Sequence, residues 1–167
     1  MKNILDKLNL SRFTSPTSLI KNTWGKLKKV PSGNIIFSKI VGQAIPYTGS
    51  ISPIVQKIEN GCASVILRDR RAVRNHLDSI HAIALANVGE FTTGLSVISQ
   101  LNEKAKAILV RIEVDYLKKA RGDVTAEAIS QIPNDLTQDT DFKIVANISN
   151  LQNEVVCRVT ATWRVRP

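Results

Sequence analysis

The sequence predicts an α+β domain in which a curved antiparallel sheet wraps around one long helix. Two observations support this. Between Ala82 and Leu101 the chain has no Asp, Lys or Arg and no acid except Glu90, so a helix there is apolar nearly all round and must be enclosed. In the second half of the chain, apolar and polar residues alternate with a period of two, which is typical of strands with one solvated face.

A helical arm is expected over residues 1–32, ahead of the main domain at 33–167. Residues 2–10 and 16–29 each place apolar side chains on one helical face. The Pro31-Ser32-Gly33 sequence ends the second helix. The arm could contact a membrane or dock on the domain.

Docking of the arm is favoured because Trp24 and Leu27 must be covered by something.

Strands are expected on both sides of the central helix. The predicted strands are residues 34–42, 53–59, 61–68, 108–116, 122–131, 141–149 and 155–165. Ile108, Val110, Ile112, Val114 and Tyr116 share one predicted face, opposite Arg111, Glu113 and Asp115. A second apolar row, Cys157 to Val165, lies opposite Arg158, Arg164 and Arg166.

The chain carries 23 basic and 14 acidic residues, a formal charge of +9. Basic residues gather in the first thirty positions, at 68–74 and at 118–121, which favours an anionic partner such as a phosphate-bearing ligand. Nucleic acid is not expected, because no aromatic residues alternate with the basic runs and no recognition motif is present.

Cysteines and histidines indicate no metal centre. Cys62 and Cys157 lack zinc spacing, and His76 and His81 do not form an HExxH helix. With no signal peptide recognised ahead of them, the cysteines are expected to be buried thiols in a reducing cytoplasm. No integral membrane segment is expected either, since 82–101 contains too many polar residues for lipid.

The stretch RNHLDSIHAIALANVGE, residues 74–90, carries the candidate chemistry. Its single acid on the predicted buried helix is Glu90, and carboxylates are almost never buried without compensation. Burial would raise the pKa of this carboxyl and suit it to act as a general base or nucleophile.

Asn75, His81 and Glu90 resemble the motif of the hotdog-fold acyl-CoA thioesterases of the phenylacetate-pathway type. That motif has an Asn, a His six positions later, and an acid nine positions after the His. The resemblance covers residues 34–166. The spelling RNHL.SIHAIALAN also resembles a branch of the superfamily described mainly as thioesterases, and this likeness extends to the Pro46–Gly49 segment.

The resemblance implies a homodimer or a dimer of dimers that hydrolyses an acyl-CoA, with coenzyme A as part of the substrate and no separate cofactor. It also implies that Glu90 faces Asn75 and His81 of a neighbouring subunit. Asn75 would orient water or the carbonyl, and His81 would hydrogen-bond the thioester region. The predicted phosphate contacts for the polyanionic coenzyme A are Arg71, Arg74, Lys118, Lys119 and Arg121.

The chain departs from the family motif where two glycines normally follow the His. Ala82 and Ile83 stand there instead. In the family those backbone N–H groups hold the thioester carbonyl, and a helix start offers free N–H donors whatever its side chains are. The serine or threonine that some members supply from the next strand is absent from Ala107-Ile108-Leu109.

Two alternatives remain open at the level of sequence. A hotdog dehydratase or hydratase would use a His and an acid fourteen apart, a spacing that His76 and Glu90 match. A non-catalytic acyl-CoA binding protein would explain the loss of the paired glycines.

Overall fold

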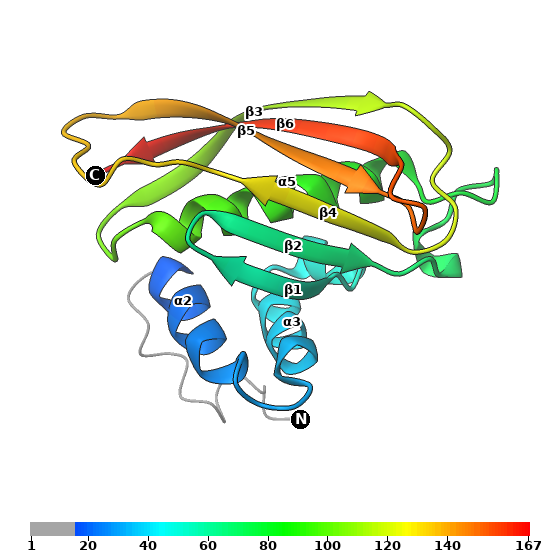
Figure 1. Ribbon diagram of the computed structural model, residues 1–167, viewed down its shortest axis with the longest axis horizontal. Helices are drawn as coiled ribbons and strands as arrows, with labels where there is room; N and C mark the ends of the chain where they lie inside the picture. Colours follow the sequence, from blue (N-terminus) through cyan, green and yellow to red (C-terminus); the bar gives the residue numbers. More distant parts are fainter. Residues whose placement is uncertain (1–15) are drawn as a thin grey trace.

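The computed structural model describes residues 16–167, and Figure 1 shows a curved sheet with one long helix against its inner face. The six strands are antiparallel and run in the order β1-β2-β4-β5-β6-β3. They are β1 (Ile54–Glu59), β2 (Cys62–Leu67), β3 (Lys106–Tyr116), β4 (Val124–Ile129), β5 (Thr140–Ser149) and β6 (Val155–Arg166). The helices are α2 (Pro16–Leu27), α3 (Gly33–Ala44), α4 (Pro46–Ser50), η2 (Arg71–Val73) and α5 (Ala82–Gln100).

Helix α5 is the enclosed helix that the sequence predicts. It packs against all six strands and also contacts α2 and α4. By length and composition alone it could cross a membrane, but 67% of its most apolar window is buried inside the domain. The prediction of a core helix is therefore confirmed.

Two glycines let α5 approach the sheet closely. A Cβ atom on Gly89 would lie 2.3 Å from a methyl carbon of Val159 on β6, and one on Gly94 would lie 3.0 Å from the ring of Trp163. The Trp163 indole also donates a 3.0 Å hydrogen bond from Nε1 to the hydroxyl of Thr93. Because neither glycine has a side chain, helix α5 can pack directly against β6, and no larger residue would fit at either position.

Helix α2 docks on the domain, as the sequence favours. Trp24 is buried, donates from Nε1 to the carbonyl oxygen of Ile58 at 2.9 Å, and meets Phe37 edge-on with ring centroids 5.0 Å apart. Lys21 donates from Nζ to the carbonyl oxygen of Leu101 at 2.8 Å. The helix predicted at 2–10 lies outside the described residues.

The strand predicted at 34–42 is wrong, because this segment forms helix α3. Its isoleucines and valine favour a strand by composition, yet the side chains that enter the core follow helical spacing: Phe37, Ile40 and Val41 are buried while Ile35 and Ile36 are exposed. The sheet therefore begins at β1, near the predicted strand at 53–59.

The other predicted strands are present within a few residues of their expected ends. The apolar row of β6 is buried, as predicted from its alternation. The single apolar face predicted for β3 is wrong, because a bulge between Leu109 and Arg111 interrupts the alternation. Ala107, Leu109 and Val114 pack against the core, whereas Ile108, Val110 and Ile112 are 50%, 43% and 40% exposed. Strand β3 is an edge strand, so one side of its backbone has no neighbour in the described chain.

Substitution of Gly89 by Ala should destabilise the protein by about 1–3 kcal/mol, because the added methyl group would overlap Val159 in a packed core. Chemical denaturation monitored by circular dichroism would measure the loss.

Gly25→Ala is the matched control, since Gly25 lies in helix α2 and a Cβ added there would meet no atom within 4 Å. It should be neutral or stabilise by up to about 1 kcal/mol, because alanine favours helix more than glycine does. Equal destabilisation by both changes would contradict the close contact at Gly89.

Candidate active site

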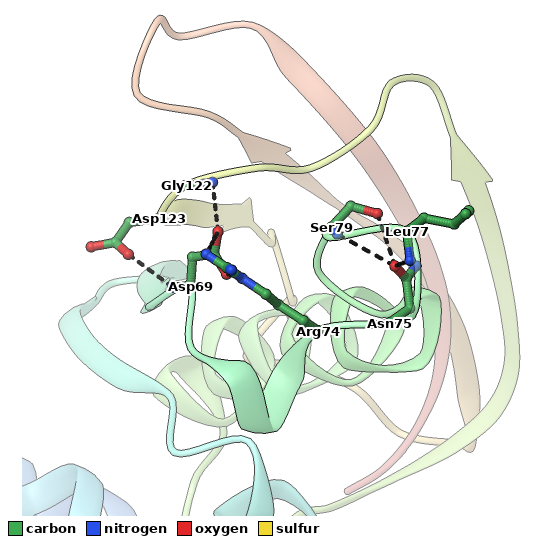
Figure 2. Close-up of polar contacts among 7 residues, drawn as sticks. All are labelled: Asp69, Arg74, Asn75, Leu77, Ser79, Gly122 and Asp123. Atoms are coloured by element: carbon green, nitrogen blue, oxygen red, sulfur yellow. Dashed lines mark hydrogen bonds and ion pairs between the residues drawn. The ribbon is translucent and has the colours of Figure 1, made fainter.

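Asn75 organises the loop that precedes helix α5. Its Oδ1 accepts hydrogen bonds from the backbone N–H of Leu77 at 2.9 Å and from the backbone N–H and hydroxyl of Ser79 at 3.3 and 3.2 Å (Figure 2). Its own N–H donates to the carbonyl oxygen of Ser79 at 2.9 Å. The carbonyl side of the Asn75 amide is thus used by the loop, whereas its NH₂ group makes no hydrogen bond within residues 16–167.

His81 caps helix α5. Its Nδ1 accepts a hydrogen bond from the backbone N–H of Ile83 at 3.1 Å. In the neutral ring with Nδ1 accepting, the proton lies on Nε2, which makes Nε2 a donor. The imidazole is exposed, so this donor faces solvent or a ligand.

The cap changes which backbone groups at the helix start are available. The N–H groups of Ala84 and Leu85 both donate to the carbonyl oxygen of His81, and that of Ile83 donates to its ring. In the described part of the chain, the Ala82 N–H is the one helix-start donor left without an acceptor. Of the two predicted oxyanion donors, Ala82 is free and Ile83 is occupied.

Glu90 lies in the middle of α5 and is half-buried. Burial raises the pKa of its carboxyl above the ordinary glutamate value. Within residues 16–167, no hydrogen bond or ion pair reaches this carboxylate. The uncompensated acid that the sequence indicates is therefore present.

The three motif residues do not converge within one chain. Asn75 and His81 lie together at the start of α5, but Glu90 is nine residues further along the same helix. At 1.5 Å per residue, this places it about 13 Å from His81 along the helix axis. A single reacting centre cannot touch both within one subunit.

The two basic segments predicted to contact phosphate are brought side by side. Asp69, whose side chain is 7% exposed, accepts from Nε of Arg74 at 2.6 Å and from the backbone N–H of Gly122 at 2.8 Å (Figure 2). Asp123 in turn accepts from the Asp69 N–H at 2.8 Å, and Ile80 donates to the carbonyl oxygen of Ala120. These bonds join the 68–81 segment to the 117–123 loop beside the helix start.

The predicted phosphate contacts divide into two groups. Arg74 is held by Asp69, and Lys118 pairs with Glu154 at 2.7 Å. Arg71, Lys119 and Arg121 make no ion pair within residues 16–167, so their charges remain available to an anion.

Two residues of this region did not stand out in the sequence. Asp69 joins the two basic segments, since it accepts hydrogen bonds from Arg74 and Gly122. Its one distinguishing feature in the sequence is that it is an acid among three arginines. Asn87 is 8% exposed, donates weakly to the carbonyl oxygen of Tyr47 at 3.5 Å, and has a buried Oδ1 with no partner in the described chain. Its position one helical turn before Glu90 was the available signal.

No three His, Cys, Asp or Glu side chains in the described residues gather closely enough to hold a metal ion.

A curved antiparallel sheet that encloses one helix defines a hotdog-fold protein. Residues 33–165 match a family described as a domain of unknown function, DUF4442, and the chain belongs to that family. The comparison with curated proteins gave no match.

Solved structures agree with the fold. A genomics target designated APC5556 is 30% identical, with a TM-score of 0.75 over 90% of this chain and 98% of its own. A Pseudomonas aeruginosa protein described as a probable thioesterase is 17% identical, with a TM-score of 0.72 over 82% and 96% of the two chains. A phenylacetic acid degradation-related protein from Ralstonia eutropha is 16% identical, with a TM-score of 0.61 over 71% and 89%. The hotdog fold expected from the sequence is confirmed.

Substitution of Asp69 by Asn should destabilise the protein by about 1.5–3 kcal/mol at neutral pH, the usual contribution of hydrogen bonds to a charged group. The hydrogen bond from Arg74 holds the pKa of Asp69 below its ordinary value. Its contribution is therefore fully present above the ordinary aspartate pKa and is lost as pH falls through the lower native pKa. Urea unfolding at a series of pH values would measure this.

Asp141→Asn is the control, because Asp141 pairs with Arg164 on the exposed surface. Its loss should be much smaller than that of Asp69→Asn. Equal losses would show that Asp69 has no special structural role.

Substitution of Glu90 by Gln should stabilise the protein at neutral pH. The native pKa of Glu90 is raised, so the native state holds its proton more tightly and loses stability as pH rises from the ordinary glutamate pKa to the raised value. The neutral amide avoids this loss, and its advantage should vanish in acid. Thermal unfolding from about pH 4 to about pH 8 gives the comparison.

Glu154→Gln should have the opposite sign, because the bond from Lys118 lowers the pKa of Glu154. A Glu90→Gln protein less stable than the parent at neutral pH would mean that the carboxylate has a compensating partner.

Proposed function

We propose that this protein is an acyl-CoA thioesterase whose active site is shared between two subunits. The observation that carries the proposal is the half-buried Glu90 carboxylate, which has no partner within residues 16–167 and lies at motif spacing from Asn75 and His81. The structural likeness to proteins described as thioesterases supports the same reaction class.

Strand β3 is the proposed subunit interface. Strand β3 pairs with β6 on one side and has no neighbour on the other within residues 16–167. An 11-residue edge that also exposes Ile108, Val110 and Ile112 is a surface that proteins normally cover. Two copies that pair along β3 would extend the sheet across a two-fold axis. Because α5 runs beneath the sheet and contacts β3, the two central helices would then lie near each other.

In this arrangement Glu90 of one subunit would face the helix start of the other. Glu90 would accept a proton from a water molecule, whose oxygen attacks the thioester carbonyl carbon. The Asn75 NH₂ group, which the loop leaves free, would position the water or the carbonyl.

The developing oxyanion would be held by the Ala82 N–H and by His81 Nε2–H, supported by the helix dipole. When the tetrahedral intermediate collapses, the carbon–sulfur bond breaks and the thiolate leaves. The proton on Glu90 then neutralises the thiolate, which restores the carboxylate.

Arg71, Lys119 and Arg121 are the proposed contacts for the phosphates of coenzyme A. Arg74 and Lys118 would position this surface without binding phosphate, because each already forms an ion pair with a carboxylate. A cytoplasmic location is part of the proposal, because acyl-CoA thioesters are its substrate.

Glu90→Gln should lower kcat/KM for acyl-CoA hydrolysis by about 10²–10⁴-fold, the usual contribution of a general base. Asn75→Ala should also reduce it, whereas Asn102→Ala, which removes a similar loop-forming amide between α5 and β3, should not. Free-thiol release from a panel of acyl-CoAs measures all three.

Mixing the two inactive variants separates a shared site from one within a single chain. A hybrid dimer of Glu90→Gln and Asn75→Ala subunits has one site with both residues intact, so random re-association should restore about a quarter of the parent activity. Hydrolysis unchanged in both variants would refute the site. Acyl-CoA binding without turnover in the parent would indicate the binding protein instead, and the occupied Ile83 N–H is consistent with that outcome.

A further inference from the structure

A cleft of about 450 Å³ lies between helix α3, the segment from α4 to β1, and the end of β2. Its volume falls within the range of about 300–1,000 Å³ typical of small-molecule sites. None of its lining residues is a motif residue of the proposed active site.

One face of α3 forms the first wall. Ile35, Ser38, Lys39 and Gly42 follow the i, i+3, i+4, i+7 spacing of a helical stripe, while Phe37, on another face, is buried in the core. Gly42 and Gly49 meet where α3 and α4 come closest, since a Cβ on Gly49 would lie 2.1 Å from the Gly42 carbonyl oxygen. At these two positions the wall carries no side chain.

Pro53 and Ile54, at the entrance to β1, add apolar surface to the cleft, and Gln43 and Ser52 add uncharged polar side chains to its lining.

The charged side chains that line the cleft are all cationic. Lys39, Arg68 and Arg70 line it, and no carboxylate does among the described residues. Asp69 lies between the two arginines in sequence, but its carboxylate is turned to Arg74 and Gly122. Arg70 donates from Nη2 to the carbonyl oxygen of Ile51 at 2.7 Å, which holds its guanidinium beside the cleft, and its other donors make no hydrogen bond within residues 16–167.

We propose that this cleft binds a single hydrocarbon chain that carries an anionic head group. The chain would lie along the α3 stripe between Ile35, Ile54 and the glycines, and the head group would meet Lys39, Arg68 and Arg70. A free fatty acid has both features side by side, whereas an acyl-CoA carries its phosphates beyond an uncharged thioester and pantetheine arm. The inference does not rest on hydrolysis, because it concerns binding alone.

Isothermal titration calorimetry with dodecanoate tests the cleft. Dodecanoate should bind the parent protein, and dodecan-1-ol, with the same chain and no charge, should bind at least about tenfold more weakly. Lys39→Gln should weaken dodecanoate binding about two- to fivefold, the range of an exposed ion pair. Lys28→Gln, an equal charge change outside the cleft, should leave it unchanged.

Ile35→Trp and Ile36→Trp form a matched pair, since these neighbours are 41% and 44% exposed and one alone lines the cleft. Filling the cleft with Ile35→Trp should weaken dodecanoate binding by about tenfold or more, and Ile36→Trp should not. If Ile35→Trp fails to fold, Arg68→Gln provides the second test.

The same titrations with dodecanoyl-CoA and with coenzyme A alone distinguish the source of the chain. Competition of dodecanoyl-CoA with dodecanoate identifies an acyl-CoA as a ligand, and its absence identifies the free acid. Equal binding of dodecanoate and dodecan-1-ol, equal effects of the two Trp variants, or no binding would overturn the proposal. Dodecanoate should bind Glu90→Gln as tightly as it binds the parent protein, because Glu90 does not line the cleft. A loss of turnover in that variant therefore concerns the proposed active site alone.

Discussion

The close contact between helix α5 and strand β6 is the constraint on which the rest of the structure depends. Gly89 and Gly94 bring the helix against Val159 and Trp163, and the sheet can then curve around it. The same enclosure takes Glu90, next to Gly89, partly out of water and raises the pKa of its carboxyl. The packing that stabilises the domain and the chemistry proposed for it therefore have one origin.

The sequence predicts most of the fold because its periodicities are strong. A 20-residue segment with one charge must be enclosed, and the alternation of β6 places its apolar row in the core. Helix α3 was missed because its isoleucines favour a strand locally, whereas its packing against Trp24 and β1 decides the outcome. Such long-range contacts are invisible to a pattern of neighbours along the chain.

The candidate site was only partly predictable, for a related reason. Spacing indicates Asn75, His81 and Glu90. It does not indicate that His81 accepts the Ile83 N–H, or that Asp69 pairs with Arg74. Both depend on side-chain directions within a folded loop. Strand β3 is a third case, since the bulge between Leu109 and Arg111 breaks the alternation from which one shared face was predicted.

The Tyr116 hydroxyl, at the end of β3, donates a 3.0 Å hydrogen bond to the carbonyl oxygen of Ala82. This bond ties the outer edge of the sheet to the first residue of α5, whose N–H has no acceptor among residues 16–167. A partner that binds along β3 would therefore also restrict the motion of the Ala82 N–H. If the site is shared between subunits as proposed, dilution of the protein would act twice, by separating the two subunits and by loosening the peptide that each one contributes.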